Sequence, residues 1–164
     1  MNLVTRTPID LENLRFRAHH PKAGAMLLFC GDVRNHSNGK EVIALEYEAH
    51  ETMALKQIDD IVKEAQQRWE LHFVEVIHRF GKMGISECSI AIAVATSHRS
   101  DAYAASRYLI DTVKHTVPIW KKECFQNGTE EWSKGCEACG VHEHSPESMA
   151  DQHVPNQQSS ISSM

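Results

Sequence analysis

The feature that most constrains the fold is the apolar stretch 88–96, CSIAIAVAT, which carries no charged side chain. A run this short and this apolar predicts a buried strand. The stretch 24–31, GAMLLFCG, is also continuously apolar and begins and ends with glycine, so it predicts a second buried strand. The first stretch leads directly into Ser97, His98 and Arg99. Polar and cationic groups are therefore expected at a strand end.

Apolar residues at three- and four-residue spacing predict two long helices, one at 52–69 and one within the stretch 97–123. In the second helix, Ser100 or Asp101 is the expected N-cap, because either side chain can accept an unpaired backbone N–H. Pro118 should end this helix, since proline lacks an N–H and disfavours helical backbone before it. The inward-facing residues are Ala54, Ile58, Ile61, Val62, Ala65 and Trp69 in the first helix, and Ala102, Ala105, Leu109 and Val113 in the second.

Two further strands are predicted at 41–48 and 72–79, where apolar residues are concentrated in short segments. We expect 41–48 to pair with 24–31, because Asn38 and Gly39 between them favour a tight turn. Both residues tolerate the positive φ that such a turn requires.

Shorter features complete the pattern. Asp10 is a plausible N-cap for a short helix, and Gly81 and Gly84 predict a turn. The resulting order is α, β, β, α, β, β, α, and the chain has no glycine-rich phosphate-binding motif. We therefore expect an α+β fold in which helices cover a largely antiparallel sheet.

The composition excludes several classes of protein. The formal net charge is −5, so no general affinity for nucleic acid or an anionic membrane is expected. No apolar run approaches the ~20 residues that span a bilayer. The five cysteines are odd in number and lie mostly inside apolar runs, which favours a reducing compartment. We expect a cytosolic protein without a signal peptide.

The character of the sequence changes near the C-terminus. We expect one domain over residues 1–140 and a disordered polar tail over 141–164, which is rich in serine and glutamine. Cys136, Cys139, His142 and His144 are a possible zinc-type ligand set, but no second Cys pair and no apolar framework accompany them. No bound metal and no cofactor are therefore expected, and a metal-binding interaction tail remains an alternative.

Cationic residues stand at the ends of the predicted elements. Such a set suits a small phosphorylated substrate, because arginine offers forked donors to phosphate and a desolvated lysine can act as a base or nucleophile. The alternative is that these residues are solvated surface charges. The set comprises Arg34, Arg79, His98, Arg99, Lys114, Lys121 and Lys122.

Around these residues the chain resembles the large, catalytic subunit of molybdopterin synthase. Five segments carry the resemblance, in the expected order: FCGDVRNHSNG at 29–39, LEYEAHETMA at 45–54, VIHRFGKM at 76–83, TSHRSDAY at 96–103 and KHTVPIWKKE at 114–123. The resemblance spans about residues 24–132. It implies the α/β-hammerhead fold, a refinement that periodicity alone does not provide.

The resemblance also implies an activity. The family converts cyclic pyranopterin monophosphate to molybdopterin by introducing two dithiolene sulfurs, which arrive as a thiocarboxylate on the C-terminus of a small ubiquitin-like subunit. The family assembles as a central dimer of large subunits with a small subunit at each end. By position, the resemblance implies that Lys114 and Lys121 are catalytic, and that substrate is bound by Arg34, His98, Arg99, Lys114, Lys121, Lys122 and Glu123.

Two expectations follow for the site. Arg34, His98 and Arg99 should converge on one pocket, and Lys121 should act at the reacting centre while Lys114 holds the thiocarboxylate. One departure concerns an arginine that, in bacterial relatives, reaches into the neighbouring subunit's pocket; here only Lys134 lies nearby. The alternative to an enzyme is a phosphate- or nucleotide-binding module that uses the same cations without chemistry.

Overall fold

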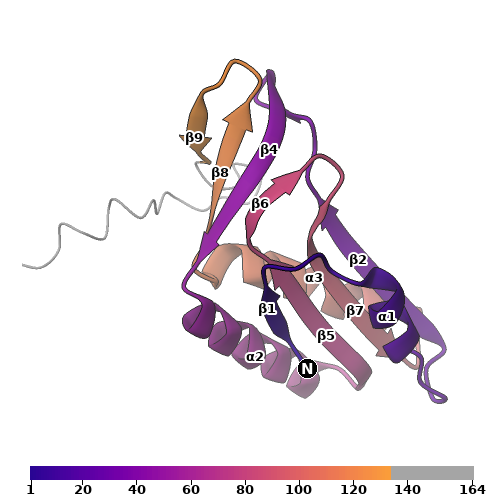
Figure 1. Ribbon diagram of the computed structural model, residues 1–164. Helices are drawn as coiled ribbons and strands as arrows, with labels where there is room; N and C mark the ends of the chain where they lie inside the picture. The colour runs from indigo at the N-terminus through magenta and orange to yellow at the C-terminus, as the bar shows by residue number, and fades with distance from the viewer. Residues whose placement is uncertain (134–164) are drawn as a thin grey trace, which may run out of the picture. The chain divides into compact units, whose positions relative to one another are not determined.

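The computed structural model describes residues 1–133, and its first sheet contains both predicted apolar strands. The strand order is β1 (Leu3–Thr5), β5 (Leu71–Arg79), β7 (Cys88–Thr96) and β2 (Ala25–Asp32) (Figure 1). The pair β1–β5 is parallel and the other pairs are antiparallel. As predicted, β7 is the buried strand, since every residue after Cys88 in it is buried.

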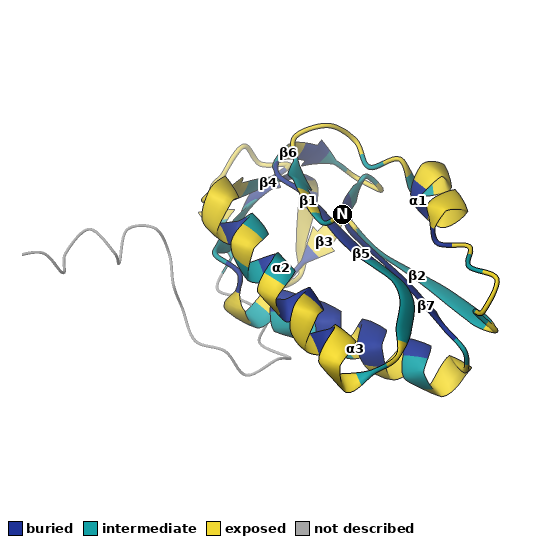
Figure 2. Cartoon of the chain, turned by 90° about the horizontal axis from the view of Figure 1, so that it is seen from below, coloured by how far each residue is buried: buried dark blue, intermediate teal, exposed yellow. Residues whose placement is uncertain are grey.

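Helices cover this sheet on both faces (Figure 2). Helices α2 (Glu51–Arg68) and α3 (Arg99–Thr116) pack on one face, and α1 (Leu11–Arg17) packs on the other. Side chains of β7 alternate between the two faces of the sheet, so both faces carry apolar residues that helices bury. Ile90, Ile92 and Val94 point into the core beneath α2 and α3, whereas Ala91 and Ala93 belong to the core beneath α1.

A second group of strands contains the candidates Lys121, Lys122 and Glu123. Its order is β3 (His36–Ser37), β4 (Lys40–Ala49), β8 (Ile119–Phe125) and β9 (Glu130–Trp132), and β6 (Gly81–Gly84) also pairs with β4. This sheet has its own small core, made by Val33, Val42, Leu45, Met83 and Phe125.

The predicted strand pair and one predicted turn were wrong. Strand β2 pairs with β7 and not with β4, and the turn at Asn38 and Gly39 instead joins β4 to the short β3. Both turn residues do have positive φ, so the turn chemistry was predicted correctly while its partner strand was not. Residues 81–84 form strand β6 along β4, where a turn was expected.

The helix ends follow the predictions in part. Asp10 caps α1 by accepting from the Asn13 N–H at 2.9 Å, and α3 ends at Thr116, just before Val117 and Pro118. The predicted cap of α3 at Ser100 or Asp101 was wrong. The helix begins two residues earlier, with His98 as N-cap and no side-chain hydrogen bond at the cap. Within residues 1–133, no helix is long and apolar enough to cross a membrane.

The α+β class and the largely antiparallel sheets are confirmed. The predicted domain boundary at residue 140, the polar tail 141–164, Lys134 and the Cys136/Cys139/His142/His144 set all lie outside the described residues.

Candidate functional site

Strand β8 determines which way the C-terminal lysines point. Successive side chains on a strand face opposite sides, so Lys121 and Glu123 share one face. Their side chains form an ion pair, with Lys121 Nζ 3.0 Å from Glu123 Oε1. Glu123 is only 7% exposed, whereas the Lys121 side chain keeps 31% of its surface. A buried carboxylate thus fixes an ammonium that solvent and ligands can still reach.

Lys122 occupies the other face of β8. Its Nζ lies 2.8 Å from Glu46 Oε2 and 3.1 Å from Glu130 Oε2, above the ring of Trp132. Hydrogen bonds to these two carboxylates, that to Glu46 first, raise the pKa of Lys122 well above its ordinary value. Lys122 therefore remains charged and bound within its own sheet. The structure does not bring it to the face of Lys121.

Tyr47 lies opposite Lys121, and His78 lies against Tyr47. Tyr47 of β4 is directly opposite Lys121 in the antiparallel register, and its ring meets the His78 ring edge-on at 5.5 Å between centroids. Burial lowers the pKa of His78 to about 4, and the charge of Lys114 contributes to that shift. His78 is thus neutral at physiological pH. Its Nδ1 lies 2.9 Å from the Arg79 carbonyl oxygen, so Nδ1 carries the proton and donates.

Lys114 lies in the last turn of α3 and is exposed. The helix dipole places partial negative charge at this end, which favours a cation. The charge of Lys114 helps to lower the pKa of His78, after burial, and the His78 ring contacts Tyr47, which is opposite Lys121. The structure therefore brings Lys121 and Glu123 into contact, and Lys114 is related to them through its electrostatic effect on His78, whose ring meets Tyr47.

Arg34, His98 and Arg99 are exposed and do not converge within one chain. Arg34 follows the end of β2, whereas the beginning of β2 pairs with Thr96, just before His98. An eight-residue strand spans about 23 Å, so these groups lie at opposite ends of the first sheet. Arg99 begins α3 and Lys114 lies near its end, about 22 Å apart along the helix axis. The expected single pocket for Arg34, His98 and Arg99 is not formed by one copy.

The turn before His98 is held by close packing. The hydroxyl of Ser97 lies 2.8 Å from His72 Nε2, and the His72 ring stacks on His20 at 5.1 Å. The Thr96 hydroxyl donates to the His98 carbonyl at 2.7 Å. Arg79, another predicted cation, is buried and donates to Glu87 at 2.9 Å, so it is a structural residue here.

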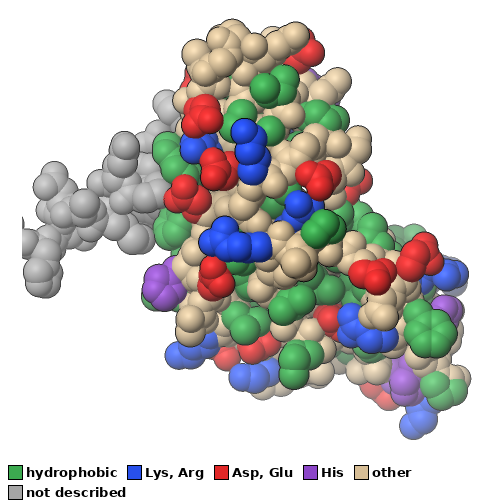
Figure 3. Space-filling model, in the orientation of Figure 1, with side chains coloured by type: hydrophobic (Ala, Val, Ile, Leu, Met, Phe, Trp, Pro, Cys, Tyr) green, Lys and Arg blue, Asp and Glu red, His purple; other side chains and the backbone are tan. Residues whose placement is uncertain are grey.

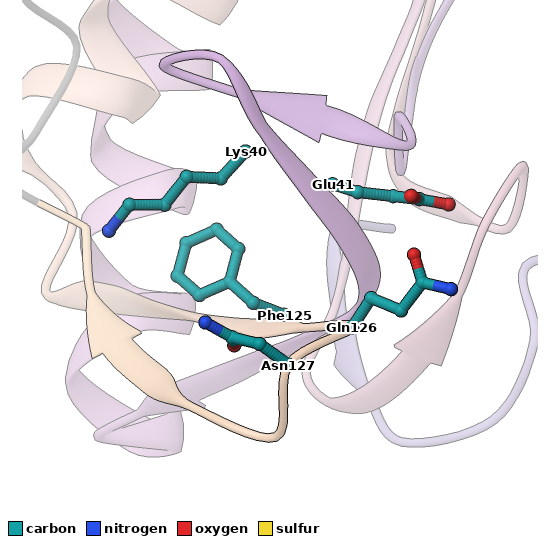
Figure 4. Close-up of a pocket in the computed structure, with 5 residues that line it drawn as sticks. All are labelled: Lys40, Glu41, Phe125, Gln126 and Asn127. Atoms are coloured by element: carbon teal, nitrogen blue, oxygen red, sulfur yellow. The ribbon is translucent and has the colours of Figure 1, made fainter.

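Two hollows accompany the second sheet. One, of about 450 Å³, is lined by Lys40, Glu41, Phe125, Gln126 and Asn127, and Lys40 extends along the Phe125 ring (Figure 4). The other, of about 290 Å³, includes Glu46, Tyr47 and Phe80 in its lining, and neither Lys114 nor Lys121 lines it. The face in Figure 3 shows Lys, Arg, Asp and Glu side chains interleaved over this sheet, without a continuous basic field. The described residues contain no cluster of three or more His, Cys, Asp or Glu side chains that could hold a metal ion.

Sequence reasoning missed Tyr47 and His78 as site residues. Both occur within motifs that it singled out, LEYEAHETMA and VIHRFGKM, but nothing in either motif indicates which strands are neighbours. Only the pairing of β4 with β8 places Tyr47 opposite Lys121.

Comparison with known proteins adds to this geometry. Residues 4–116 match the family of the MoaE protein. A molybdopterin synthase catalytic subunit from Thermoplasma volcanium is 46% identical over 125 residues, covering 76% of this chain and 89% of the relative. One from Bacillus subtilis is 42% identical over 129 residues, covering 79% and 82%. A crystal structure of molybdopterin synthase from Staphylococcus aureus matches with a TM-score of 0.75 and 36% identity, covering 79% of this chain and 94% of that one.

Proposed function

This chain belongs to the MoaE protein family, and from that membership we propose how its two lysines take part in the synthesis of molybdopterin. Its relatives are molybdopterin synthase catalytic subunits, and the chain acts as a sulfur-transferring enzyme in molybdenum cofactor biosynthesis. The substrate is cyclic pyranopterin monophosphate, and each sulfur comes from the thiocarboxylated C-terminus of a small ubiquitin-like subunit.

The observation that carries this proposal is the Lys121–Glu123 ion pair on β8. A thiocarboxylate is an anion, and an exposed ammonium at the end of a helix attracts it. Lys114 has this position, so it holds the incoming thiocarboxylate. Lys121 is fixed by a buried carboxylate and works at the reacting centre. There it gives a proton to the oxygen that the sulfur displaces from the pterin side chain, and water then hydrolyses the bond between sulfur and acyl carbon, which releases the partner's C-terminus as a carboxylate.

The chain's own described thiols do not compete as sulfur donors. Burial raises the pKa of Cys88 to about 12 and also raises the pKa of Cys30 and Cys124. Since the thiolate is the reactive form, these cysteines are poor nucleophiles at neutral pH. Sulfur supplied by a partner subunit fits this arrangement.

His98 and Arg99 serve the substrate from a second copy of the chain. They are too far from Lys114 along α3 to reach the same small molecule from the same chain. In a two-fold dimer, each copy can lend its α3 N-terminus to the two lysines of the other. A central dimer of this chain, with one small subunit bound at each end, provides two complete sites. We place this assembly in the cytosol.

Substitution of Lys121 tests the chemical role. Lys121→Ala should lower turnover of the pterin to dithiolene product by at least ~100-fold, the usual loss for an acid/base group, while binding of the small subunit stays nearly intact. The assay combines purified protein, thiocarboxylated partner and pterin substrate, and isothermal titration measures partner binding. Lys56→Ala, at an exposed position of α2, is the matched control. Near-normal turnover by Lys121→Ala would refute the mechanism.

A binding module without chemistry is the competing function, and Lys121→Arg separates the two. Arginine keeps the charge but does not release its proton in this pH range. Normal turnover by Lys121→Arg would assign Lys121 a purely electrostatic role. Absence of dithiolene product from the unsubstituted protein with both substrates would leave only the binding function.

A further inference from the structure

We infer that Tyr47 is the positioning residue of this site: its ring sets the placement of Lys121 relative to Lys114 by joining the two sheets between them. This inference rests on the proposed function, because it assigns Tyr47 a role in the reaction of the two lysines. Tyr47 touches neither substrate nor reacting atoms. It acts through the residues that it contacts.

The first contact is with β8. Tyr47 and Lys121 are a directly opposed pair in an antiparallel ladder, in which opposed Cβ atoms lie about 5 Å apart. Leu45 is opposite Glu123 in the same register, so Tyr47 and Leu45 share the face of the sheet that carries the Lys121–Glu123 ion pair. A bulky ring here restricts the rotamers that Lys121 can adopt.

The second contact is with the first sheet. The Tyr47 ring meets His78 near the end of β5 at 5.5 Å, in an edge-to-face arrangement. His78 is 7% exposed, and its Nδ1 is fixed by the Arg79 carbonyl, so it offers a rigid surface. Lys114 acts electrostatically on the same imidazole. The Tyr47–His78 pair thus connects the strand of Lys121 with the helix end of Lys114.

The third contact reaches the segment that carries Arg34. Burial raises the pKa of Tyr47 and the nearby Ser89 hydroxyl opposes that shift, while the same hydroxyl donates to the Gly31 carbonyl at 2.8 Å. Gly31 precedes the irregularity at the end of β2, three residues before Arg34. Tyr47 therefore adjoins β8 and β5 directly and is linked through Ser89 of β7 to the end of β2.

This arrangement predicts a division between ring and hydroxyl. The ring provides the contacts with Lys121 and His78, so it should matter for the placement of the lysines. The hydroxyl contacts Ser89 and should matter less. A positioning residue changes kcat more than KM, since a small displacement of a reacting group weakens the transition state more than substrate binding.

The test compares Tyr47→Phe, Tyr47→Leu and Tyr47→Met, with Tyr103→Phe and Tyr103→Leu as matched controls at an exposed tyrosine of α3. Leucine and methionine remove the ring but retain apolar volume, so that at least one of them folds; circular dichroism and the melting temperature verify this. Turnover is measured with thiocarboxylated partner and pterin. The acylation rate of Lys121 by acetic anhydride, relative to Lys56, is measured by mass spectrometry and reports the placement of Lys121 without any turnover.

We expect Tyr47→Phe to stay within ~3-fold of the unsubstituted kcat, and the folded Leu or Met variant to lose at least ~10-fold in kcat with KM changed by less than ~3-fold. In the folded Leu or Met variant, the acylation rate of Lys121 relative to Lys56 should rise at least ~3-fold. Unchanged kcat and unchanged acylation in a folded Leu or Met variant would overturn the inference. Such a result leaves the proposed function standing if the unsubstituted protein makes product and Lys121→Ala does not, so the two failures are distinguishable.

Discussion

His78 shows how burial controls a single charge at the centre of the site. The residue is packed by Tyr47 of β4, its Nδ1 is used by Arg79, and the cation that faces it is Lys114 of α3. Burial outweighs the hydrogen bond to the Arg79 carbonyl, which alone among these neighbours favours a positive charge on the ring. The fold therefore stabilises the neutral imidazole, which lets a histidine lie near a lysine without repulsion.

This charge state predicts a pH dependence of stability. The pKa of His78 falls from 6.5 in the unfolded chain to about 4 in the fold, so between these values only the unfolded chain takes up the proton. The free energy of unfolding should fall as pH drops from 6.5 to 4, by up to about 3 kcal/mol from this residue, and be unaffected by it above pH 6.5. Urea unfolding measured between pH 4 and 6.5 should show that the unfolding free energy of His78→Asn changes less with pH than that of the unsubstituted protein. His36→Asn, at an exposed position, is the control, and an identical slope in His78→Asn and unsubstituted protein would contradict the assignment.

At the scale of elements, the sequence reveals how side chains alternate along a strand better than it reveals which strands pair. The period-2 alternation of β8 separates Lys122 from Lys121 and Glu123, and it follows from local sequence once the segment is known to be a strand. The strand at 88–96 was predicted with both ends correct, because a short run without charged side chains is typical of a buried strand. Helix ends at Asp10 and Pro118 were also predictable, since each acts on neighbouring backbone.

Strand partners could not be predicted in the same way. The stretch 24–31 and the stretch 41–48 are both apolar and joined by a good turn, yet they belong to different sheets. Pairing depends on which surface buries more apolar area across the whole chain, and two residues of β3 were enough to change the hairpin partner. The opposition of Tyr47 and Lys121 depends on that pairing, which is why the sequence showed the lysines but not the ring opposite Lys121.

At Gly24, the start of one strand approaches the backbone of Ser97 too closely for a side chain to fit. The Gly24 N–H donates to the Thr96 carbonyl at 3.0 Å, and a Cβ atom at this position would lie 2.5 Å from the Ser97 carbonyl oxygen. Gly24→Ala must therefore displace the turn that leads into His98. We expect a loss of roughly 1–3 kcal/mol in the free energy of unfolding, the usual cost of overpacking.

Gly84→Ala is the matched control, because its nearest neighbour would be the Glu87 Oε2 atom at 3.5 Å, an ordinary contact. Denaturant unfolding of both variants measures the difference. Equal stabilities would show that the Ser97 turn can move freely, and would remove Gly24 from the residues that place His98.

At the scale of the whole molecule, α3 acts as a spacer between two sets of functional groups. Its first residue is Arg99 and its last turn carries Lys114, so one copy presents cations at both helix ends but cannot unite them. Both ends remain exposed in residues 1–133. Two copies related by a two-fold axis can bring the N-terminus of one α3 to Lys114 and Lys121 of the other, which gives two equivalent sites per dimer.

This assembly predicts complementation between two defective variants. Arg99→Ala and Lys121→Ala should each be nearly inactive alone, the first through substrate binding weakened by ~1.5–3 kcal/mol and the second through lost chemistry. When equal amounts are denatured together and refolded, about half of the dimers should contain one copy of each. In such a mixed dimer one site carries both substitutions and the other carries neither, so about a quarter of the unsubstituted activity should return.

The turnover assay measures the recovery. The control is each variant denatured and refolded alone under the same conditions. If both groups instead served one site within a single copy, every site in the mixture would carry one defect and no activity would be regained. That outcome would refute a shared site.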